Sequence, residues 1–99
     1  MINIAKEYRR LARLLQSAYV SEIARQDLID TGLMIKTFTV RAINLKRFPK
    51  FEIDAVDYFV YVDGNFKVTD NVLRGALYKK FEKGLEDLQV KILLEKLEK

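Results

Sequence analysis

The 99-residue chain has a mass of 11.6 kDa, so we expect one domain over residues 1–99, because two separate cores do not fit in so short a chain. Its composition, 49% hydrophobic and 32% charged, excludes a disordered chain, and the absence of Cys and His excludes disulfides, the common zinc and haem sites, and Ser-His or Cys-His catalysis. The net charge of +4 is uneven, since residues 1–50 carry ten basic and four acidic groups and residues 51–99 carry eight and ten.

The first predicted element is a long amphipathic helix from Ile4 to about Gln26, with Asn3 as its cap. Apolar residues recur along it every three or four positions, the spacing of one buried helix face. These positions are Ile4, Tyr8, Leu11, Leu15, Ala18, Tyr19 and Ile23. The opposite face is basic, and we interpret it first as an ordinary solvent-facing surface.

A turn is predicted at Asp30-Thr31-Gly32, because Asp bonds to nearby backbone N–H groups and Gly accepts a sharp reversal. A strand is expected to follow over residues 34–43, where β-branched residues are frequent and alternate residues fall on opposite faces. Phe38 and Val40 share one face and are expected to point into the core.

An exposed basic connection is predicted over residues 44–50, containing Lys46, Arg47, Lys50 and the only proline, Pro49. It should join two antiparallel strands. The apolar pattern of the return strand changes parity after residue 53, which predicts a bulge or a break near residues 54–55. The segment after the break fits either a strand or a short helix.

A second turn is predicted at Asp63-Gly64-Asn65, followed by a final helix that Thr69 or Asp70 caps. One apolar stripe of this helix should pack on the first helix. The stripe comprises Leu73, Leu77, Phe81, Leu85, Leu88 and Ile92. The expected fold class is therefore α+β: a long N-terminal helix, a small antiparallel sheet made of a hairpin and a short element, and a long C-terminal helix packed on the first.

Two features of the final helix predict contacts. Gly84 lies in mid-helix at a cost of about 1 kcal/mol relative to Ala, which indicates a close helix crossing or a kink. Further along, the apolar residues are too many for one buried face, so some should be exposed in a monomer and are candidates for a subunit interface. The candidates are Val90, Leu93, Leu94 and Leu97.

The tetrapeptide Ile29-Asp30-Thr31-Gly32 is similar to the active-site sequence of retroviral-type aspartic proteases, in which two subunits each supply one carboxylate. The rest of the chain disagrees with that family. Leu33-Met34 follows the tripeptide, the four glycines do not form a Gly-rich flap, and both ends are predicted to be helical. A protease is therefore kept only as a third alternative, with Asp30 as its nucleophile-activating group.

Three segments, in order, resemble the small tail-completion and neck proteins of long-tailed bacteriophages. Residues 29–38 resemble a Val-Asp-Thr-Gly-x-Leu-Arg-x-Ser-Ile pattern, and residues 58–65 resemble Tyr-Ala-x-Tyr-Val-Glu-x-Gly-Thr. Residues 71–77 resemble Pro-Phe-Leu-Arg-Pro-Ala-Leu, with both prolines lost. The matching residues are interpreted as fold determinants, with Arg74 expected to pair with Asp30 or Asp63. They are Asp30, Thr31, Gly32, Tyr58, Tyr61, Asp63, Gly64, Leu73 and Arg74.

The resemblance implies a non-enzymatic virion protein without a cofactor, assembled in the bacterial cytoplasm and located in the neck or tail. Copies would form a ring, a hexamer or a dodecamer, around the DNA channel and would contact a head-side connector and the tail terminator or tube proteins, but no membrane. Lys46, Arg47 and Lys50 would face DNA or an adjacent ring. The main alternative is a free-standing nucleic-acid-binding module that uses Arg9, Arg10, Arg13 and the basic connection to contact phosphates.

Overall fold

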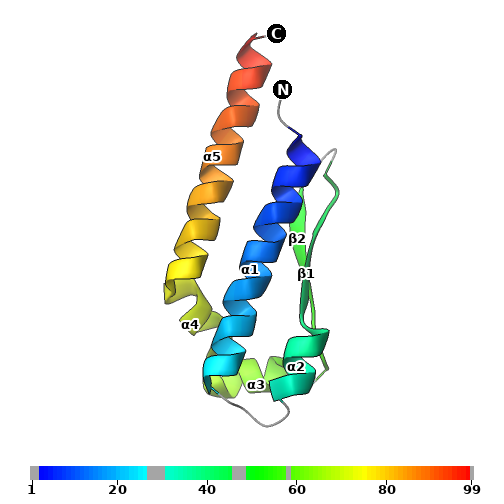
Figure 1. Cartoon of the computed structure of the whole chain (residues 1–99), viewed down its shortest axis with the longest axis vertical. Helices are drawn as coiled ribbons and strands as arrows, with labels where there is room; N and C mark the ends of the chain where they lie inside the picture. The colour runs from blue at the N-terminus through cyan, green and yellow to red at the C-terminus, as the bar shows by residue number, and fades with distance from the viewer. Residues whose placement is uncertain (1–2, 27–30, 46–48, 58, 99) are drawn as a thin grey trace.

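A computed structural model describes residues 3–26, 31–45, 49–57 and 59–98 of the chain. In these residues two helices precede one short hairpin and three helices follow it (Figure 1). The elements are α1 (Ile4–Gln26), α2 (Thr31–Thr37), β1 (Thr39–Ile43), β2 (Lys50–Asp54), α3 (Phe59–Phe66), α4 (Val68–Arg74) and α5 (Ala76–Glu98).

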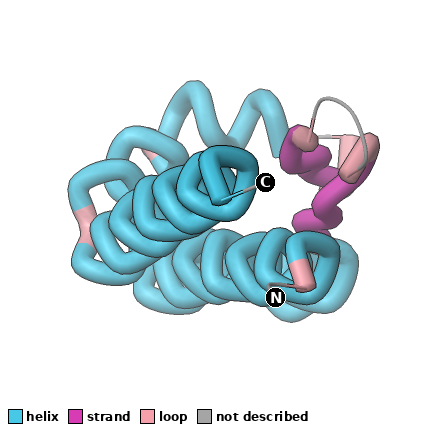
Figure 2. The backbone as a smooth tube through the Cα atoms, turned by 90° about the horizontal axis from the view of Figure 1, so that it is seen from above, coloured by secondary structure: helices cyan, strands magenta, loops and turns pink. Residues whose placement is uncertain are grey.

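The two long helices define the shape of the molecule. Helices α1 and α5 pack side by side and run antiparallel, and the short helices α2, α3 and α4 lie together at one end (Figure 1). Seen along the long axis, α1, α5 and the two strands surround the core (Figure 2). The domain is elongated, 52 × 23 × 18 Å. The α+β architecture, with the C-terminal helix packed on the first, is the one predicted from the sequence.

Helix α1 follows its predicted pattern closely. Asn3 caps it, because its Oδ1 accepts a hydrogen bond from the Lys6 backbone N–H at 3.1 Å. Its apolar face is buried, with Ala12 in addition to the predicted positions and with Ile4 only partly buried. This face packs against both the sheet and α5, so α1 is the element that the other elements share.

The segment after the first gap differs from the prediction. Residues 31–37, expected to be a turn and the start of a strand, form helix α2, and the strand begins only at Thr39. Met34 and Phe38 are both fully buried. Residues four apart share a face in a helix and also in a strand, so this pair could not distinguish the two. Thr37 Oγ1 and the Phe38 N–H complete the helix end by donating to the carbonyls of Leu33 and Met34.

The hairpin is present as predicted. Strands β1 and β2 pair antiparallel, from Thr39 opposite Asp54 to Ile43 opposite Lys50. The outer face carries Arg41, which pairs with Glu52 and, at 3.8 Å, with Asp54. The break predicted near residues 54–55 is also present, and the short-helix alternative is the one observed, because α3 begins at Phe59.

The predicted turn at residues 63–65 is wrong, because these residues belong to α3. The reversal occurs instead at Lys67, which adopts the left-handed conformation with φ 53°. Gly64 has no positive φ, so the glycine that suggested a turn does not use its conformational freedom there.

The final helix begins later than predicted. Thr69 and Asp70 lie inside α4, which ends at Arg74, and Gly75 is extended (φ −82°, ψ 162°) before α5 begins at Ala76. The predicted single helix is therefore two. Leu73 belongs to α4 and is exposed, so it does not join the buried stripe that Phe81 and Leu88 form on α5.

Two aromatic groups fill the core. Tyr19 stacks on Phe38 with ring centroids 4.7 Å apart, and Phe59 meets Phe38 edge-on at 5.3 Å, which joins α1, the start of β1 and α3. Nearer the chain termini, Phe51 of β2 packs edge-on against Phe81 of α5 at 5.1 Å. The sheet is thus held to both long helices by side chains of its inner face.

Candidate functional site

The most unusual surface of the molecule is an apolar stripe on α5, formed by Val90, Leu93, Leu94 and Leu97. Their exposed fractions are 55%, 58%, 53% and 74%. Their spacing of three and four residues places them on one face, covering two turns. This exposure agrees with the expectation that these side chains cannot all be buried in a single chain.

The stripe lies opposite the face by which α5 contacts the core. Leu88 is buried, and Ile92 is packed against the core. Val90 comes two positions after Leu88, and Leu94 comes two positions after Ile92. Two positions correspond to a rotation of about 200° around the helix axis, so Val90 and Leu94 point away from the core. The end of α5 is therefore apolar on two opposite sides. A helix that is apolar on both sides is normally covered on both, and in this chain one side is uncovered.

The apolar character is confined to the last turns of α5. Earlier on the same outer face the exposed residues are Lys79, Lys83 and Glu86, which keep the helix solvated. A shallow hollow lies where the charged and apolar parts meet, lined by Glu86, Gln89, Val90 and Leu93. The surface thus changes from charged to apolar along α5, and the apolar part has a polar border.

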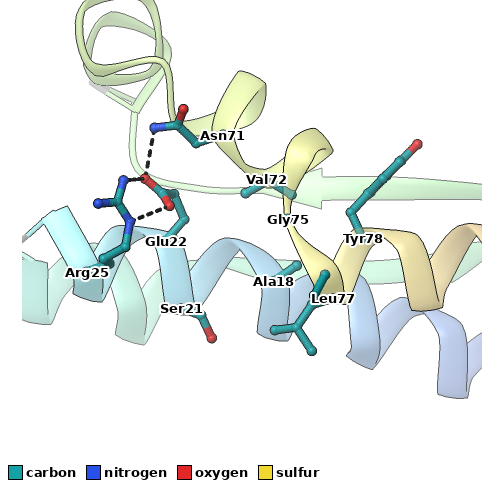
Figure 3. Close-up of a pocket in the computed structure, with 10 residues that line it drawn as sticks. Ala18, Ser21, Glu22, Arg25, Asn71, Val72, Gly75, Leu77 and Tyr78 are labelled. Atoms are coloured by element: carbon teal, nitrogen blue, oxygen red, sulfur yellow. Dashed lines mark hydrogen bonds and ion pairs between the residues drawn. The ribbon is translucent and has the colours of Figure 1, made fainter.

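A second candidate is a hollow of about 190 Å³ between α1, α4 and the start of α5 (Figure 3). Its polar wall is Glu22, whose side chain is only 10% exposed. Arg25 donates to both carboxylate oxygens, at 2.9 and 2.6 Å, and the amides of Gln26 and Asn71 donate to Oε2 at 2.6 and 3.0 Å. Gly75 lines the same hollow at the junction of α4 and α5.

The hydrogen bonds to Glu22 fix its charge. The Arg25 guanidinium, and to a smaller extent the two amides, lower the pKa of Glu22 from 4.5 to about 2, although burial opposes the shift. All polar atoms of the carboxylate are used within the chain. The cluster joins α1 to α4 across 49 positions of sequence, and we interpret it as a structural clamp.

A polar chain beside this cluster explains one motif residue. The Asp63 carboxylate accepts the Thr69 backbone N–H at 2.6 Å and the Thr69 hydroxyl at 2.9 Å. Because Thr69 has only one hydroxyl hydrogen, the Tyr19 hydroxyl must be the donor in its 2.9 Å contact with Thr69 Oγ1. Burial raises the pKa of Tyr19. Asp63 therefore caps the N-terminus of α4, and α1 is tied to the cap.

A third hollow, of about 330 Å³, lies between α1 and β1. Arg9, Arg13 and Arg41 line it, around an apolar floor that includes Ala12 and Val40. Arg10, the other arginine of this part of α1, pairs instead with Glu7 at 3.1 Å and does not line this hollow. The hollow thus brings together basic side chains from α1 and β1, of which Arg41 also pairs with Glu52 and Asp54.

The predicted site residues do not form one site. Lys50 is exposed at the start of β2, while Lys46 and Arg47 lie outside the described residues. Arg74, at the end of α4 beside Leu73, makes no ion pair with Asp63, whose carboxylate accepts hydrogen bonds from Thr69.

The first two motifs are only partly described. Asp30 and Tyr58 lie outside the described residues, as do the side chains of Thr31 and Tyr61. Gly32 lies in α2 and Gly64 in α3, each with open space where a Cβ would stand. The expected pairing of Arg74 with Asp30 therefore stays a prediction.

Over the described residues, no three acidic side chains are grouped as metal ligands, and no helix is long and apolar enough to cross a membrane. In comparisons with known protein families, curated proteins and solved structures, the chain matches none.

Proposed function

We propose that the chain acts by assembly, as a non-enzymatic subunit of the neck or tail-completion ring of a long-tailed bacteriophage virion. The observation that carries the assembly part is the apolar stripe at the end of α5. The virion part rests on the resemblance of residues 29–38, 58–65 and 71–77 to that family.

The stripe has the properties of an interface core. Its four exposed apolar side chains lie next to one another on one helix face, and contiguous exposed apolar patches often mark binding surfaces. Its outer limit is polar, with Glu86, Gln89 and Lys96 exposed around it, as at a typical interface rim. In a ring, each subunit presents one surface to a different surface of its neighbour, and the stripe would be one of these two surfaces.

The family motifs support the proposal through their positions in the fold. Gly32 lies in the helix that leads into β1, Asp63 caps α4, and Leu73 and Arg74 end α4 just before the break at Gly75. Asp63 and the pair Leu73-Arg74 thus act at the two ends of α4, whereas Gly32 lies inside α2. This fits the interpretation that the shared residues are fold determinants and not a reaction centre.

The proposed partners follow from this role. They are other copies of the chain, as a hexamer or a dodecamer, a head-side connector, and the tail terminator or tube proteins. The basic connection with Lys46, Arg47 and Lys50 would face packaged DNA or an adjacent ring.

The proposal is tested by gene deletion and complementation in the phage or prophage that encodes the chain. Deletion should give DNA-filled heads and free tails that do not join. Wild-type chain should restore joined particles, whereas Leu93→Glu with Leu97→Glu should not, because charges in the stripe oppose its burial. The matched control, Lys79→Glu with Lys83→Glu, changes the charged part of the same helix face and should complement. Joined particles without the gene, or full complementation by the stripe variant, would contradict the proposal.

A second candidate function, a nucleic-acid-binding module, is favoured by the basic hollow of Arg9, Arg13 and Arg41. Phosphate contacts predict that affinity for DNA falls steeply with salt. Replacing Arg9 and Arg13 by Gln should then weaken binding of the purified chain to a mixed-sequence duplex and reduce the salt dependence. Little binding of the wild-type chain at physiological salt would remove this candidate.

A further inference from the structure

Strand β2 has an outer edge whose backbone groups are unpaired within the described part of the chain. The Val40 N–H donates to Gln16 Oε1 of α1 at 2.9 Å, so this N–H points away from β2. Val40 and Ile53, which lie opposite each other, are therefore a pair without backbone hydrogen bonds between them. The N–H and C=O groups of Ile53 therefore point away from β1. By the alternation of an antiparallel ladder, those of Phe51 do so too.

The two edges of the sheet are treated differently. The outer edge of β1 packs against α1 and is partly satisfied by Gln16. The strands stand at the margin of the molecule, and β2 meets no further strand in the described residues (Figure 2). All of β2 except Phe51 is exposed, including Ile53 at 45%. A bare edge with an exposed Ile is a template for another strand.

We propose that β2 pairs with β2 of a second copy of the chain, antiparallel, about a two-fold axis that passes beside Glu52. Phe51 lies opposite the partner's Ile53, and each such pair exchanges two backbone hydrogen bonds, which gives four bonds in the dimer. The two hairpins become one four-stranded sheet. Its inner face then covers each exposed Ile53 with the partner's Phe51.

The order of charges along β2 selects this partner and this register. Charges on an edge strand usually discourage pairing, but here Lys50 lies directly opposite the partner's Asp54, twice in the dimer. Glu52 lies opposite the partner's Glu52, and each of these carboxylates is already paired with Arg41 of its own chain. The basic start of β2 therefore meets the acidic end of β2 in the second copy.

Neighbouring registers are worse. An axis at residue 53 places Glu52 opposite the partner's Asp54 twice in the dimer, and it leaves Lys50 opposite no acidic residue. An axis at residue 51 places Pro49, which has no N–H, where the partner's Ile53 needs a donor. The register about Glu52 also pairs all five residues of β2.

This contact is separate from the stripe on α5 and does not depend on the proposed function. For Lys50 it names a protein partner, the acidic end of β2 in a second copy, in place of the DNA or adjacent ring given above for the basic connection. A dimer by β2 would exist whether or not the chain is found in a virion.

Disulfide trapping tests the register. The chain has no Cys, so Glu52→Cys introduces a single thiol. In the proposed register the two copies of residue 52 lie opposite each other without backbone hydrogen bonds between them. The Cα atoms of such a pair are about 4.5 Å apart, within reach of a disulfide. The matched control is Lys50→Cys on the same exposed strand face, where the two thiols would be roughly 13 Å apart.

Under mild oxidation Glu52→Cys should form a covalent dimer and Lys50→Cys should remain mostly monomeric on a non-reducing gel. Equal cross-linking of both variants, no cross-linking of Glu52→Cys, or preferential cross-linking of Lys50→Cys would each overturn the proposal.

Charge exchange tests the pairing of side chains without a covalent bond. Lys50→Asp alone places two acidic groups opposite each other, and Asp54→Lys alone places two basic groups opposite each other. Each variant should be a monomer in sedimentation velocity at concentrations where the wild type is a dimer. An equimolar mixture should dimerise, because both cross-strand pairs are then of opposite sign, and this restoration also shows that both variants fold. A wild type that stays monomeric up to about 1 mM, single variants that dimerise like the wild type, or a mixture that does not dimerise would overturn it.

Discussion

Gly84 of α5 lies directly against Leu11 of α1. A Cβ on residue 84 would stand 2.7 Å from Leu11 Cδ2, closer than such atoms approach in proteins, and Leu11 is fully buried. Helix α5 continues without interruption through this point. Of the two sequence interpretations of Gly84, the close crossing is therefore confirmed. The missing side chain is what allows the two long helices to approach here.

The first prediction compares this glycine with one that has no such contact. Gly84→Ala should lower the free energy of unfolding by about 1–2 kcal/mol, because the overlap with Leu11 exceeds the gain in helix propensity. Gly64→Ala, in α3 with nothing within 4 Å of the new Cβ, should raise it by about 0.5–1 kcal/mol. Urea denaturation of the two variants checks both signs. A stabilised Gly84→Ala would show that Leu11 can move aside.

The second prediction concerns pH. Folding lowers the pKa of Glu22 from 4.5 to about 2, so its ionised carboxylate stabilises the fold above pH 4.5. This contribution is lost as pH falls from 4.5 towards 2. Glu22→Gln should therefore cost about 1–3 kcal/mol at pH 7 and should make stability less dependent on pH between 5 and 2. Denaturation of the wild type and the variant at a series of pH values measures both effects. The same decrease in the free energy of unfolding between pH 5 and 2 in both proteins would refute the prediction.

The third prediction concerns the cap of α4. Asp63→Ala removes both acceptors of Thr69 and leaves its hydroxyl without that acceptor, so we expect a loss of about 1–2 kcal/mol. Asp57→Ala, an exposed acidic residue that precedes α3, is the control and should change stability by less than about 0.5 kcal/mol. Chemical denaturation of the two variants at pH 7 distinguishes them. Equal effects would mean that Asp63 does not act as a cap.

The fourth prediction separates the two faces at the end of α5. Leu88→Ala should cost about 2–4 kcal/mol, because Leu88 is buried against the core. Leu94→Ala, six residues further along on the exposed stripe, should leave the free energy of unfolding of the isolated chain nearly unchanged, within about 0.5 kcal/mol. Thermal unfolding at low protein concentration checks the pair. A large loss for Leu94→Ala would mean that the stripe is already covered in solution.

Periodicity predicted the elements that depend on one long pattern. The buried face of α1, the pairing of the hairpin, the packing of α5 on α1 and the exposure of Leu93 and Leu97 all follow from which positions are apolar. It failed where a short segment fits two periods. Met34 and Phe38 suit a strand and a helix equally, and Gly64 was interpreted as a turn residue although the helix simply continues through it.

The polar clusters could not be predicted because no local pattern contains them. Glu22 and Asn71 are brought together only when α4 packs on α1, and Thr69 was interpreted as a helix cap when it is in fact the residue that Asp63 caps. The Gly75 break between α4 and α5 is what places these residues beside α1. Sequence spacing alone gives no sign of contacts across so many positions.

Peptide mass spectrometry on gradient-purified, DNA-filled particles is the decisive test of the proposed virion role. We expect this chain at a ring-like stoichiometry of about six or twelve copies per particle. Its absence from particles in which the major capsid and tail-tube proteins are well detected would contradict the proposed virion role.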